Sequence, residues 1–303
     1  MNILILGNSS DAHAVHMKNV LTQAGVTVDY LDTRMFPSQL KISWEPNSVF
    51  SSLKLSPEHQ LDFQDIHSVY WRSLGSVGIP SLEDSHQQSI AFNDSMSVLR
   101  TLFKACPARW VNSWEAYQFH KEKPLQLRQV HLLGVKIPQT LITNDPQEVI
   151  RFAKSYEKAI FKPVYGGAHT QTLAESLLEP KRLNLALSVA PVTLQEYIPG
   201  TNVRSYVIGD SVYAAEIRSH DLDFRTDIEA ELIPVELPKQ IQQQCKDIAK
   251  ALYLEWTAID WRRNPAGEYF FLEANPSPMF LHFERQTGFP ITEKLVELLM
   301  VRS

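Results

Sequence analysis

An apolar run that begins at Phe270 ends with two oxygen-bearing side chains, Glu273 and Asn275. Asp260 lies on the strand-like run before it, and residues 264–268 read as the turn between the two runs. Because residues i and i+2 of a strand project from the same face, Glu273 and Asn275 point together, and Asp260 joins them across a hairpin. The pattern therefore predicts a β-hairpin that brings three oxygen side chains together.

Three oxygen ligands on two strands suit a hard divalent cation. Magnesium is usually held by one or two carboxylates, keeps several waters and takes its other oxygens from substrate phosphates. The hairpin accordingly predicts a magnesium site that works with ATP, with Mn²⁺ as a second candidate for the metal. A plain hairpin with solvated carboxylates explains the same residues, because Asn and Pro are ordinary turn formers.

The length of the chain indicates several subdomains. At 303 residues it exceeds the usual size of a single hydrophobic core, so we expect two or three subdomains with an active-site cleft between them. The content of 44% hydrophobic and 21% charged residues is ordinary for a globular protein, and no run approaches the roughly 18 apolar residues of a membrane span. Residues 1–7 read as a buried strand rather than a signal peptide, which predicts a cytoplasmic protein without a membrane anchor.

Charge and cysteine content exclude two classes of function. A net charge of −5 argues against general binding of nucleic acid. Cys106 and Cys245 lie far apart without metal-ligand spacing, so we expect two buried thiols and no zinc site. Neither feature sets the oligomeric state, and a homo-oligomer stays open.

Short strands and helices alternate in the first third of the chain. This order with short links predicts a parallel sheet in a domain of residues 1–105. The expected elements are strands at 3–6, 26–31 and 68–71, a helix at 12–24, and an added hairpin of 40–44 with 49–55.

Two further subdomains are expected at residues 106–200 and 201–303. A helical region at 112–133, ended by Gly134, leads into the first of them. The remaining expected elements are helices at 146–156, 239–252 and 291–300, and strands at 159–163, 192–197, 203–208 and 212–217. The last two strands flank Gly209-Asp210, which is a strong hairpin signal.

Two lysines are candidates for contact with phosphate. Lys162 lies in the strand at 159–163 and precedes Gly166 and Gly167, whose backbone amides can close over phosphates as a lid. Lys123, in the helical region, is its candidate partner. Two glycines are also a common turn, and a lysine on a helix is solvated by default.

The strand at 192–197 ends beside a candidate purine site. A strand edge offers backbone donors and acceptors to adenine, and a carboxylate there can bind ribose hydroxyls. The residues at this edge are Gln195, Glu196, Tyr197 and Ile198, directly before Pro199-Gly200. A core strand that ends in a turn explains the same residues.

Three arginines, Arg204, Arg218 and Arg225, fall in a stretch of two strands and a loop. A guanidinium group fits the geometry of phosphate and carboxylate and keeps its charge, so it suits the stabilisation of a transferring phosphoryl group. For each arginine, a surface salt bridge is the alternative.

In this order, the motifs resemble those of the ATP-grasp superfamily, specifically its ribosomal-protein-S6-modifying and glutathione-synthetase-like branch. The resemblance covers residues from about 112 to the C-terminus. Its most specific motifs are DFRT at 223–226, TAID at 257–260, FLEANPSP at 271–278 and ERQTG at 284–288. Where close relatives carry Asn after an Arg-Ser pair, this chain carries Asp227 after Arg225-Thr226.

The resemblance implies an α/β protein with an ATP-grasp fold and an N-terminal parallel-sheet domain of the pre-ATP-grasp type. Residues 106–200 would form the central subdomain with the glycine-rich lid, and residues 201–303 the subdomain with the magnesium site. The roles it implies are phosphate contacts by Lys123 and Lys162, adenine contacts at 195–198, magnesium binding by the hairpin trio, and orientation of phosphate and acyl groups by the three arginines.

The resemblance also implies a reaction. A carboxylate is a poor electrophile, so ATP phosphorylates it to an acyl phosphate, an amine then displaces phosphate, and ADP and orthophosphate leave. The expected enzyme is a carboxylate-amine ligase acting on an amino acid, a small peptide or a protein tail.

A looser resemblance concerns the first domain, which ends in VYWR at 69–72. It is similar to that of the microviridin-type peptide ligases, which form side-chain ester or amide links in ribosomal precursor peptides. This similarity makes a peptide ligase the second candidate function. A non-catalytic nucleotide-binding protein and a kinase stay open as well.

Overall fold

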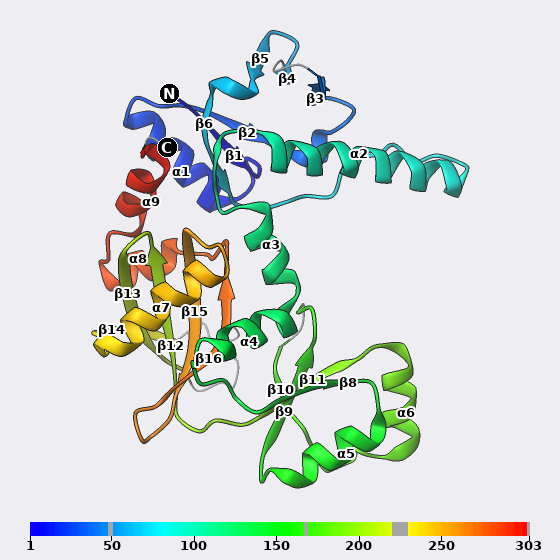
Figure 1. The fold of residues 1–303 in the computed structure, drawn as a ribbon, viewed down its shortest axis with the longest axis vertical. Helices are drawn as coiled ribbons and strands as arrows, with labels where there is room; N and C mark the ends of the chain where they lie inside the picture. The colour runs from blue at the N-terminus through cyan, green and yellow to red at the C-terminus, as the bar shows by residue number, and fades with distance from the viewer. Residues whose placement is uncertain (48–50, 167–168, 220–229, 302–303) are drawn as a thin grey trace. The chain divides into compact units, whose positions relative to one another are not determined.

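The computed structural model describes residues 1–303 except 48–50, 167–168, 220–229 and 302–303. The chain forms two compact units (Figure 1). The first unit contains residues 1–116, 254–256 and 277–303, and the second contains residues 117–253 and 257–276. The three-part division expected from the sequence stays a prediction.

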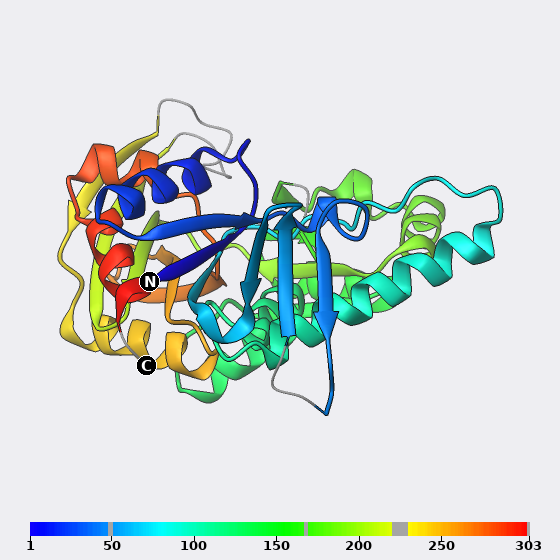
Figure 2. The same cartoon turned by 90° about the horizontal axis from the view of Figure 1, so that it is seen from above.

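A parallel sheet forms the centre of the first unit. Its strand order is β2-β1-β6-β7, and every neighbouring pair is parallel. The strands are β1 (Asn2–Leu6), β2 (Thr27–Leu31), β6 (Ile66–Trp71) and β7 (Arg109–Val111). Helices α1 (Ala12–Gln23) and α9 (Ile291–Met300) contact each other and pack on the strands (Figure 2). The predicted α/β class with an N-terminal parallel sheet is confirmed.

The first unit also holds an antiparallel sheet and two more helices. The expected hairpin is part of a sheet of three strands, β3 (Lys41–Trp44), β4 (Ser51–Ser56) and β5 (His59–Asp62). Part of the second expected strand, residues 49–50, lies outside the described residues. The helices are α2 (Ser85–Ala105), which the sequence patterns did not predict, and α8 (Leu281–Thr287).

An antiparallel sheet of order β10-β9-β11-β8 builds the first half of the second unit. The strands are β8 (Thr140–Thr143), β9 (Ala159–Pro163), β10 (Gln171–Thr172) and β11 (Val192–Glu196). Helices α5 (Pro146–Ser155) and α6 (Pro180–Val189) contact each other and share a buried apolar cluster with this sheet. Proline at the first turn of both helices explains where they begin, because its missing N–H is not needed there.

A second sheet, of order β14-β13-β12-β15-β16, carries the predicted hairpin at its edge. The strands are β12 (Thr201–Ile208), β13 (Ser211–Arg218), β14 (Glu231–Val235), β15 (Trp256–Arg263) and β16 (Tyr269–Asn275). Helix α7 (Lys239–Ala251) packs on β12 and β13. Short 3₁₀ turns complete the described elements at Thr33–Met35, Phe63–Asp65 and Glu175–Leu177.

The helical region expected at 112–133 is two helices rather than one. Helix α3 (Trp114–Lys121) ends, and α4 (Lys123–Leu132) begins after Glu122. Pro124 lies in the first turn of α4, where its ring and missing N–H prevent a continuous helix. The break places Lys123 at the start of α4.

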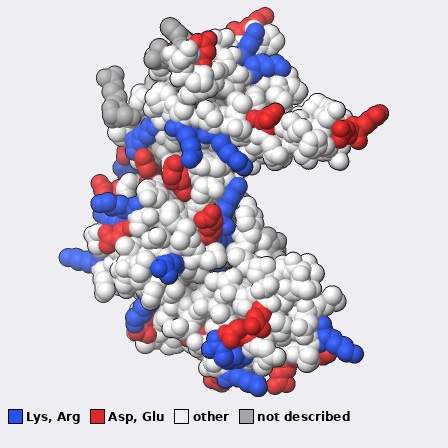
Figure 3. Space-filling model, turned by 45° about the vertical axis from the view of Figure 1, so that its right-hand side comes forward, with Lys and Arg blue, Asp and Glu red and all other residues white. Residues whose placement is uncertain are grey.

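Charges of both signs are mixed over the face of the molecule that Figure 3 draws, in keeping with the modest net charge of −5. None of the helices in the described residues combines the length and the hydropathy that a membrane span requires. The cytoplasmic location and the lack of general nucleic-acid binding stay predictions.

Candidate active site

The three oxygen side chains of the hairpin occupy neighbouring positions on β15 and β16. Asp260 pairs directly with Glu273 across the two strands, and Ala258 pairs with Asn275. The register shifts after Asp260, so that Trp261 pairs with Phe271. Such a bulge bends a strand and re-aims its side chains, and bulges are common beside functional sites.

Each carboxylate of the hairpin has a cationic partner. Lys123 donates a hydrogen bond from Nζ to Oε2 of Glu273. Arg204 donates from Nε and from a terminal nitrogen to the two oxygens of Asp260, at 2.7 and 2.8 Å. Two parallel bonds of this kind are among the strongest charge-assisted contacts in proteins.

The charges around Glu273 keep it ionised. Burial would raise the pKa of Glu273, but the ammonium groups of Lys123 and Lys162 outweigh burial and lower it to about 2. For Arg204, burial opposes the charged form, but Asp260 raises the pKa of the guanidinium above its ordinary value. The structure therefore brings both predicted lysines and one predicted arginine to the hairpin carboxylates.

His120 is a residue at this site that the sequence patterns did not indicate. Its imidazole lies in the field of Lys123 and Glu273, and burial, with the charge of Lys123, lowers the pKa of His120. Its buried Nδ1 has no hydrogen-bond partner among the described residues. The only sequence signal was its spacing, three residues before Lys123.

The predicted lid begins close to Lys123. Gly166 has a φ of +116°, and a Cβ added there would lie 3.7 Å from Nζ of Lys123. A left-handed backbone of this kind favours glycine. Gly167 lies outside the described residues, so the lid stays a prediction.

A pocket lies beside Lys162, where the adenine was expected. All four predicted residues line it, and Arg262 and Asn202 close it from the second sheet. The complete lining is Pro138, Ile160, Lys162, Thr170, Gln195, Glu196, Tyr197, Ile198, Asn202, Arg262 and Leu272.

Several polar groups of this strand edge already have partners. The backbone N–H of Glu196 donates to Gln139, and that of Tyr197 donates to Lys158. One carboxylate oxygen of Glu196 accepts from the N–H of Gln139 at 2.8 Å. The carbonyl of Ile198 accepts from Arg262 at 2.9 Å. The N–H groups of Glu196 and Tyr197 are therefore already used, and donors to a base must come from elsewhere on this edge.

One such group is the side-chain oxygen of Gln195. Thr140 donates its hydroxyl proton to the carbonyl of Pro138 at 2.7 Å, so its Oγ1 accepts from Nε2 of Gln195 at 2.9 Å. This relay fixes the orientation of the amide. Oε1 of Gln195 is buried and accepts no hydrogen bond among the described residues. A residue that lines the pocket therefore carries a buried acceptor without a partner among the described residues, and an acceptor suits the exocyclic amine of adenine.

Arg218 is a predicted residue that the structure does not bring to the carboxylates. Arg218 ends β13, its side chain is 62% exposed, and its Nε lies 3.5 Å from Glu216. Arg225 and Asp227 lie outside the described residues. In the part of the chain that the structure describes, no three His, Cys, Asp or Glu side chains form a metal cluster. Two carboxylates and the amide of Asn275 fit magnesium, which takes further oxygens from phosphate and water.

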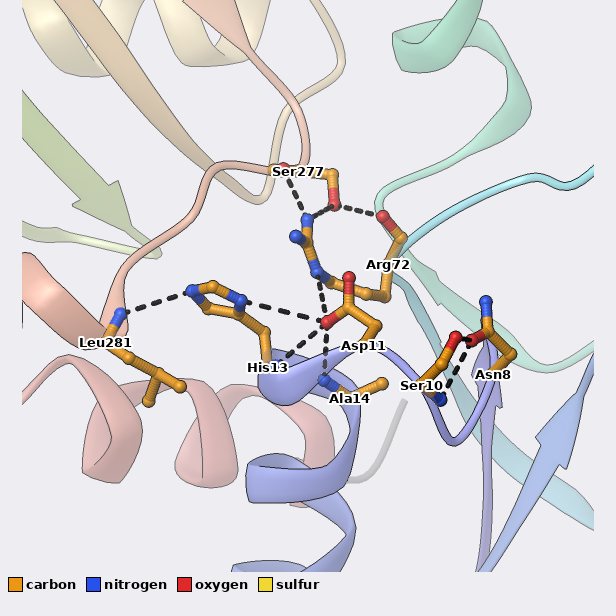
Figure 4. Close-up of polar contacts among 8 residues, drawn as sticks. All are labelled: Asn8, Ser10, Asp11, His13, Ala14, Arg72, Ser277 and Leu281. Atoms are coloured by element: carbon orange, nitrogen blue, oxygen red, sulfur yellow. Dashed lines mark hydrogen bonds and ion pairs between the residues drawn. The ribbon is translucent and has the colours of Figure 1, made fainter. Parts of the chain in front are cut away.

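A second polar cluster lies at the carboxyl edge of the parallel sheet, within the first unit (Figure 4). Asp11 caps α1 by accepting from the N–H groups of His13 and Ala14, and it also accepts from Nε of Arg72 at 3.1 Å. Arg72 donates to the carbonyl and the hydroxyl of Ser277 at 2.7 and 2.9 Å. The side chain of Arg72 is 9% exposed and that of Asp11 is 21% exposed, so the network is part-buried.

The low pKa of Glu273 predicts a pH dependence of stability. Its folded pKa of about 2 lies below its ordinary value of 4.5, so its stabilising effect is complete above pH 4.5 and is lost as the pH falls toward 2. We expect the difference in urea midpoint between wild type and Glu273→Gln to be constant from about pH 7 to 5 and to shrink below. A difference that grows toward acid would contradict the assignment of the charge.

Comparisons with known proteins cover both units. A family model described as the RimK-like ATP-grasp domain matches residues 120–299, and one described as the MvdD pre-ATP-grasp domain matches residues 2–118. "Probable alpha-L-glutamate ligase 2" of Shewanella amazonensis is 27% identical over 267 residues, which is 83% of this chain and 81% of that protein. "Probable alpha-L-glutamate ligase 1" of Shewanella oneidensis is 30% identical over 57% of this chain, and the match spans only 62% of that protein.

Solved structures match over nearly the whole chain. The ATP-grasp ligase PsnB complexed with a minimal precursor has a TM-score of 0.85 and 30% identity, over 98% of this chain and 97% of that one. The macrocyclase MdnC of Microcystis aeruginosa, bound with the precursor peptide MdnA, has a TM-score of 0.87 and 25% identity, over 99% of this chain and 100% of that one. PsnB has also been solved with magnesium and ADP, at 29% identity.

Proposed function

We propose that this chain, which belongs to the RimK-like ATP-grasp family, acts on a peptide. As an ATP-dependent carboxylate-amine ligase, it would link side chains within that peptide. The observation that carries this proposal is the likeness to PsnB, a ligase seen with a precursor peptide, which extends over 98% of this chain at 30% identity. The match of residues 2–118 to the MvdD pre-ATP-grasp domain supports the same substrate class for the first unit.

The proposed cofactors are ATP and magnesium. We assign the base to the pocket at Gln195, the phosphates to Lys123 and Lys162, and the metal to Asp260, Glu273 and Asn275. Oε1 of Gln195 has no hydrogen-bond partner among the described residues, which supports the assignment of the base. The direct pairing of Asp260 with Glu273 supports the assignment of the metal. Magnesium, when bound, would supply charge neutralisation and orientation of the phosphoryl group.

The proposed reaction has two steps. A carboxylate oxygen of the substrate attacks the γ-phosphorus of ATP, and the bond to the β-phosphate oxygen breaks, which gives an acyl phosphate and ADP. An amine or hydroxyl of the peptide then attacks the acyl carbon, loses its proton, and expels orthophosphate. Lys123 and Lys162 would hold the phosphates, while Arg218 and Arg225 are the proposed groups for the charge of the acyl phosphate.

Arg204 has a different part in this proposal. Arg204 forms two hydrogen bonds with Asp260 and would therefore orient a metal ligand. The sequence pattern, in contrast, predicts that it contacts phosphate or acyl oxygens. A guanidinium fork fits a carboxylate as well as a phosphate, so both interpretations share the same chemistry.

Addition of glutamate to an acceptor is the second candidate function. The curated relatives of Shewanella carry glutamate-ligase names, and the first of them matches over 81% of its own length. That activity uses the same ATP chemistry with an amino acid as one partner. The two candidates differ only in the substrate.

A product assay separates these candidates. We would incubate the protein with magnesium and ATP and either a candidate precursor peptide or glutamate with candidate acceptors. ADP with loss of one water per bond in the peptide supports the first proposal, and a mass gain of one glutamate residue supports the second. AMP and pyrophosphate would refute the acyl-phosphate route, and a product that gains a phosphate would indicate a kinase.

We also predict that Gln195 sets the preference for ATP over GTP. Gln195→Leu removes the buried acceptor for the amine of adenine, while guanine, which carries a carbonyl there, gains nothing from it. One hydrogen bond contributes about 0.5–1.5 kcal/mol, so we expect KM for ATP to rise up to about tenfold and KM for GTP to change little. Thr140→Val should raise KM for ATP by a smaller factor, because it removes the hydroxyl that orients the amide of Gln195. Thr140→Ser keeps that hydroxyl and should leave KM unchanged. An equal rise for both nucleotides would contradict the prediction.

A further inference from the structure

In the part of the chain that the structure describes, strand β16 lies at the edge of its sheet and pairs with β15 on one side only. Ala274 pairs with Ile259 of β15, and both polar groups of its backbone bond to the side chain of Gln126 instead of to β15. Gln126 donates from Nε2 to the carbonyl of Ala274 at 3.0 Å and accepts from its N–H at 2.9 Å. One amide side chain thus takes the place of a neighbouring strand at this residue.

Gln126 lies on α4, one turn after Lys123, and its side chain is among the buried polar groups at 2% exposure. Helix α4 packs against β16 (Figure 1). Residues three apart on a helix lie on one face, so Lys123 and Gln126 reach consecutive residues of the strand, Glu273 and Ala274.

We propose that Gln126 is a positioning residue of the magnesium site. Ala274 is the residue between Glu273 and Asn275, so a rotation of its peptide groups would turn both side chains away from Asp260. The amide of Gln126 restrains that rotation at both polar atoms of Ala274, and His120 adds a hydrogen bond to the backbone of the same residue. Thr257 supports the next residue, since its hydroxyl donates to the carbonyl of Asn275 at 2.8 Å. The inference rests on the proposed assignment of the metal.

An edge strand needs such a restraint more than an inner strand does. An unpaired N–H or C=O that is buried costs free energy, and an edge residue without a partner can twist to reach water. Partners in the outer shell of a metal site typically change metal affinity by about 10- to 100-fold when they are removed. The same bonds would change only stability if Gln126 were a purely structural residue.

The test measures metal binding directly. Gln126→Met has a similar shape and no amide. With Mn²⁺ as the probe and ADP present, we expect the Kd of Mn²⁺, measured by electron paramagnetic resonance, to rise about tenfold or more. The Kd of ADP without metal should stay within about twofold. The magnesium concentration for half-maximal turnover should rise with the Kd of Mn²⁺, while kcat at saturating magnesium should change much less.

Asn112→Leu provides a matched control. Asn112 is also buried, and its amide donates to the carbonyl of Trp256 at 2.8 Å and accepts from the N–H of Glu255 at 2.7 Å. Both of these partners lie four or more residues before Asp260. We expect this variant to lose thermal stability without a tenfold rise in the Kd of Mn²⁺. Gln126→Asn, whose amide is one methylene too short to reach Ala274, replaces Gln126→Met if the latter unfolds at the assay temperature.

Two outcomes would overturn the inference. One is a Kd of Mn²⁺ within about twofold of wild type in the folded Gln126 variant. The other is a rise in the Kd of Mn²⁺ in Asn112→Leu that equals the rise in the Gln126 variant. Glu273→Gln separates this failure from a failure of the metal assignment. If Glu273→Gln loses Mn²⁺ and the Gln126 variant does not, only the role of Gln126 is wrong. If neither variant loses Mn²⁺, the metal lies elsewhere.

Discussion

ADP release is expected to fall at least about a thousandfold when Glu273 is replaced by glutamine, because the variant keeps the shape of the side chain but loses the charge that would bind the metal. A thousandfold loss corresponds to about 4 kcal/mol of transition-state stabilisation. That is the order expected for a metal ion that neutralises the charge of a transferring phosphoryl group, which is several kcal/mol. The measurement is ADP release at saturating ATP and magnesium, followed together with the Kd of Mn²⁺.

Glu268→Gln is the matched control for this prediction. Glu268 lies at the turn of the same hairpin and forms an ion pair with Lys136, as Glu273 does with Lys123. Hydrogen bonds from Lys136 and Asn264 lower its pKa, so it too is held as a carboxylate. We expect the turnover of Glu268→Gln to stay near that of wild type. Undiminished ADP release from Glu273→Gln would refute the metal assignment, and an equal loss in both variants would show a general effect on the hairpin.

Short-range patterns were sufficient to predict the hairpin. The i, i+2 spacing of Glu273 and Asn275 puts both on one face of a strand, and a turn at 264–268 leaves Asp260 as the nearest acidic residue on the opposite strand. The structure pairs Asp260 with Glu273 directly. The bulge after Asp260 could not be predicted, because nothing in the alternation of apolar residues marks which strand carries the extra residue.

Partners far apart in the sequence could not be predicted in the same way. Lys123 and Glu273 are 150 residues apart, and Gln126 and Ala274 are 148 apart. No local pattern distinguishes Gln126 from a solvated glutamine on a helix, because its role depends on the open edge of β16. Lys123 was linked to the site by its pairing with Lys162 as a phosphate candidate and by the family resemblance, and neither carries information on Gln126 or His120.

The helix break at Glu122, in contrast, has a local signal in the sequence. Pro124 is favoured in the first turn of a helix and disfavoured in its interior, so the expected helix at 112–133 should have been divided there. The break matters for the site, because it sets the direction of α4 and thereby the face that presents Lys123 and Gln126. Helix α2 has a weaker signal, because Asp84 caps its start but its four serines weaken its apolar periodicity.

Arg204→Ala is expected to lower the free energy of unfolding by about 3–5 kcal/mol, because removal of one partner leaves a buried carboxylate without compensation. Both oxygens of Asp260 accept from Arg204, and Asp260 is only 9% exposed. Urea unfolding without metal measures the loss. Arg204→Lys should lose less, since lysine keeps the charge but cannot form two parallel bonds. Arg218→Ala, at an exposed position of the next strand, should change stability by less than about 0.5 kcal/mol.

Magnesium gives this prediction a second arm, because an uncompensated Asp260 should bind a cation more strongly than one already paired with Arg204. We therefore expect magnesium with ADP to stabilise Arg204→Ala by more than it stabilises wild type, and to recover part of the lost free energy. A guanidinium that served only the phosphates would give a different result, since its removal would weaken nucleotide binding and reduce the stabilisation by magnesium with ADP. An Arg204→Ala protein as stable as wild type would show that Asp260 is solvated and that the pair contributes nothing to the fold.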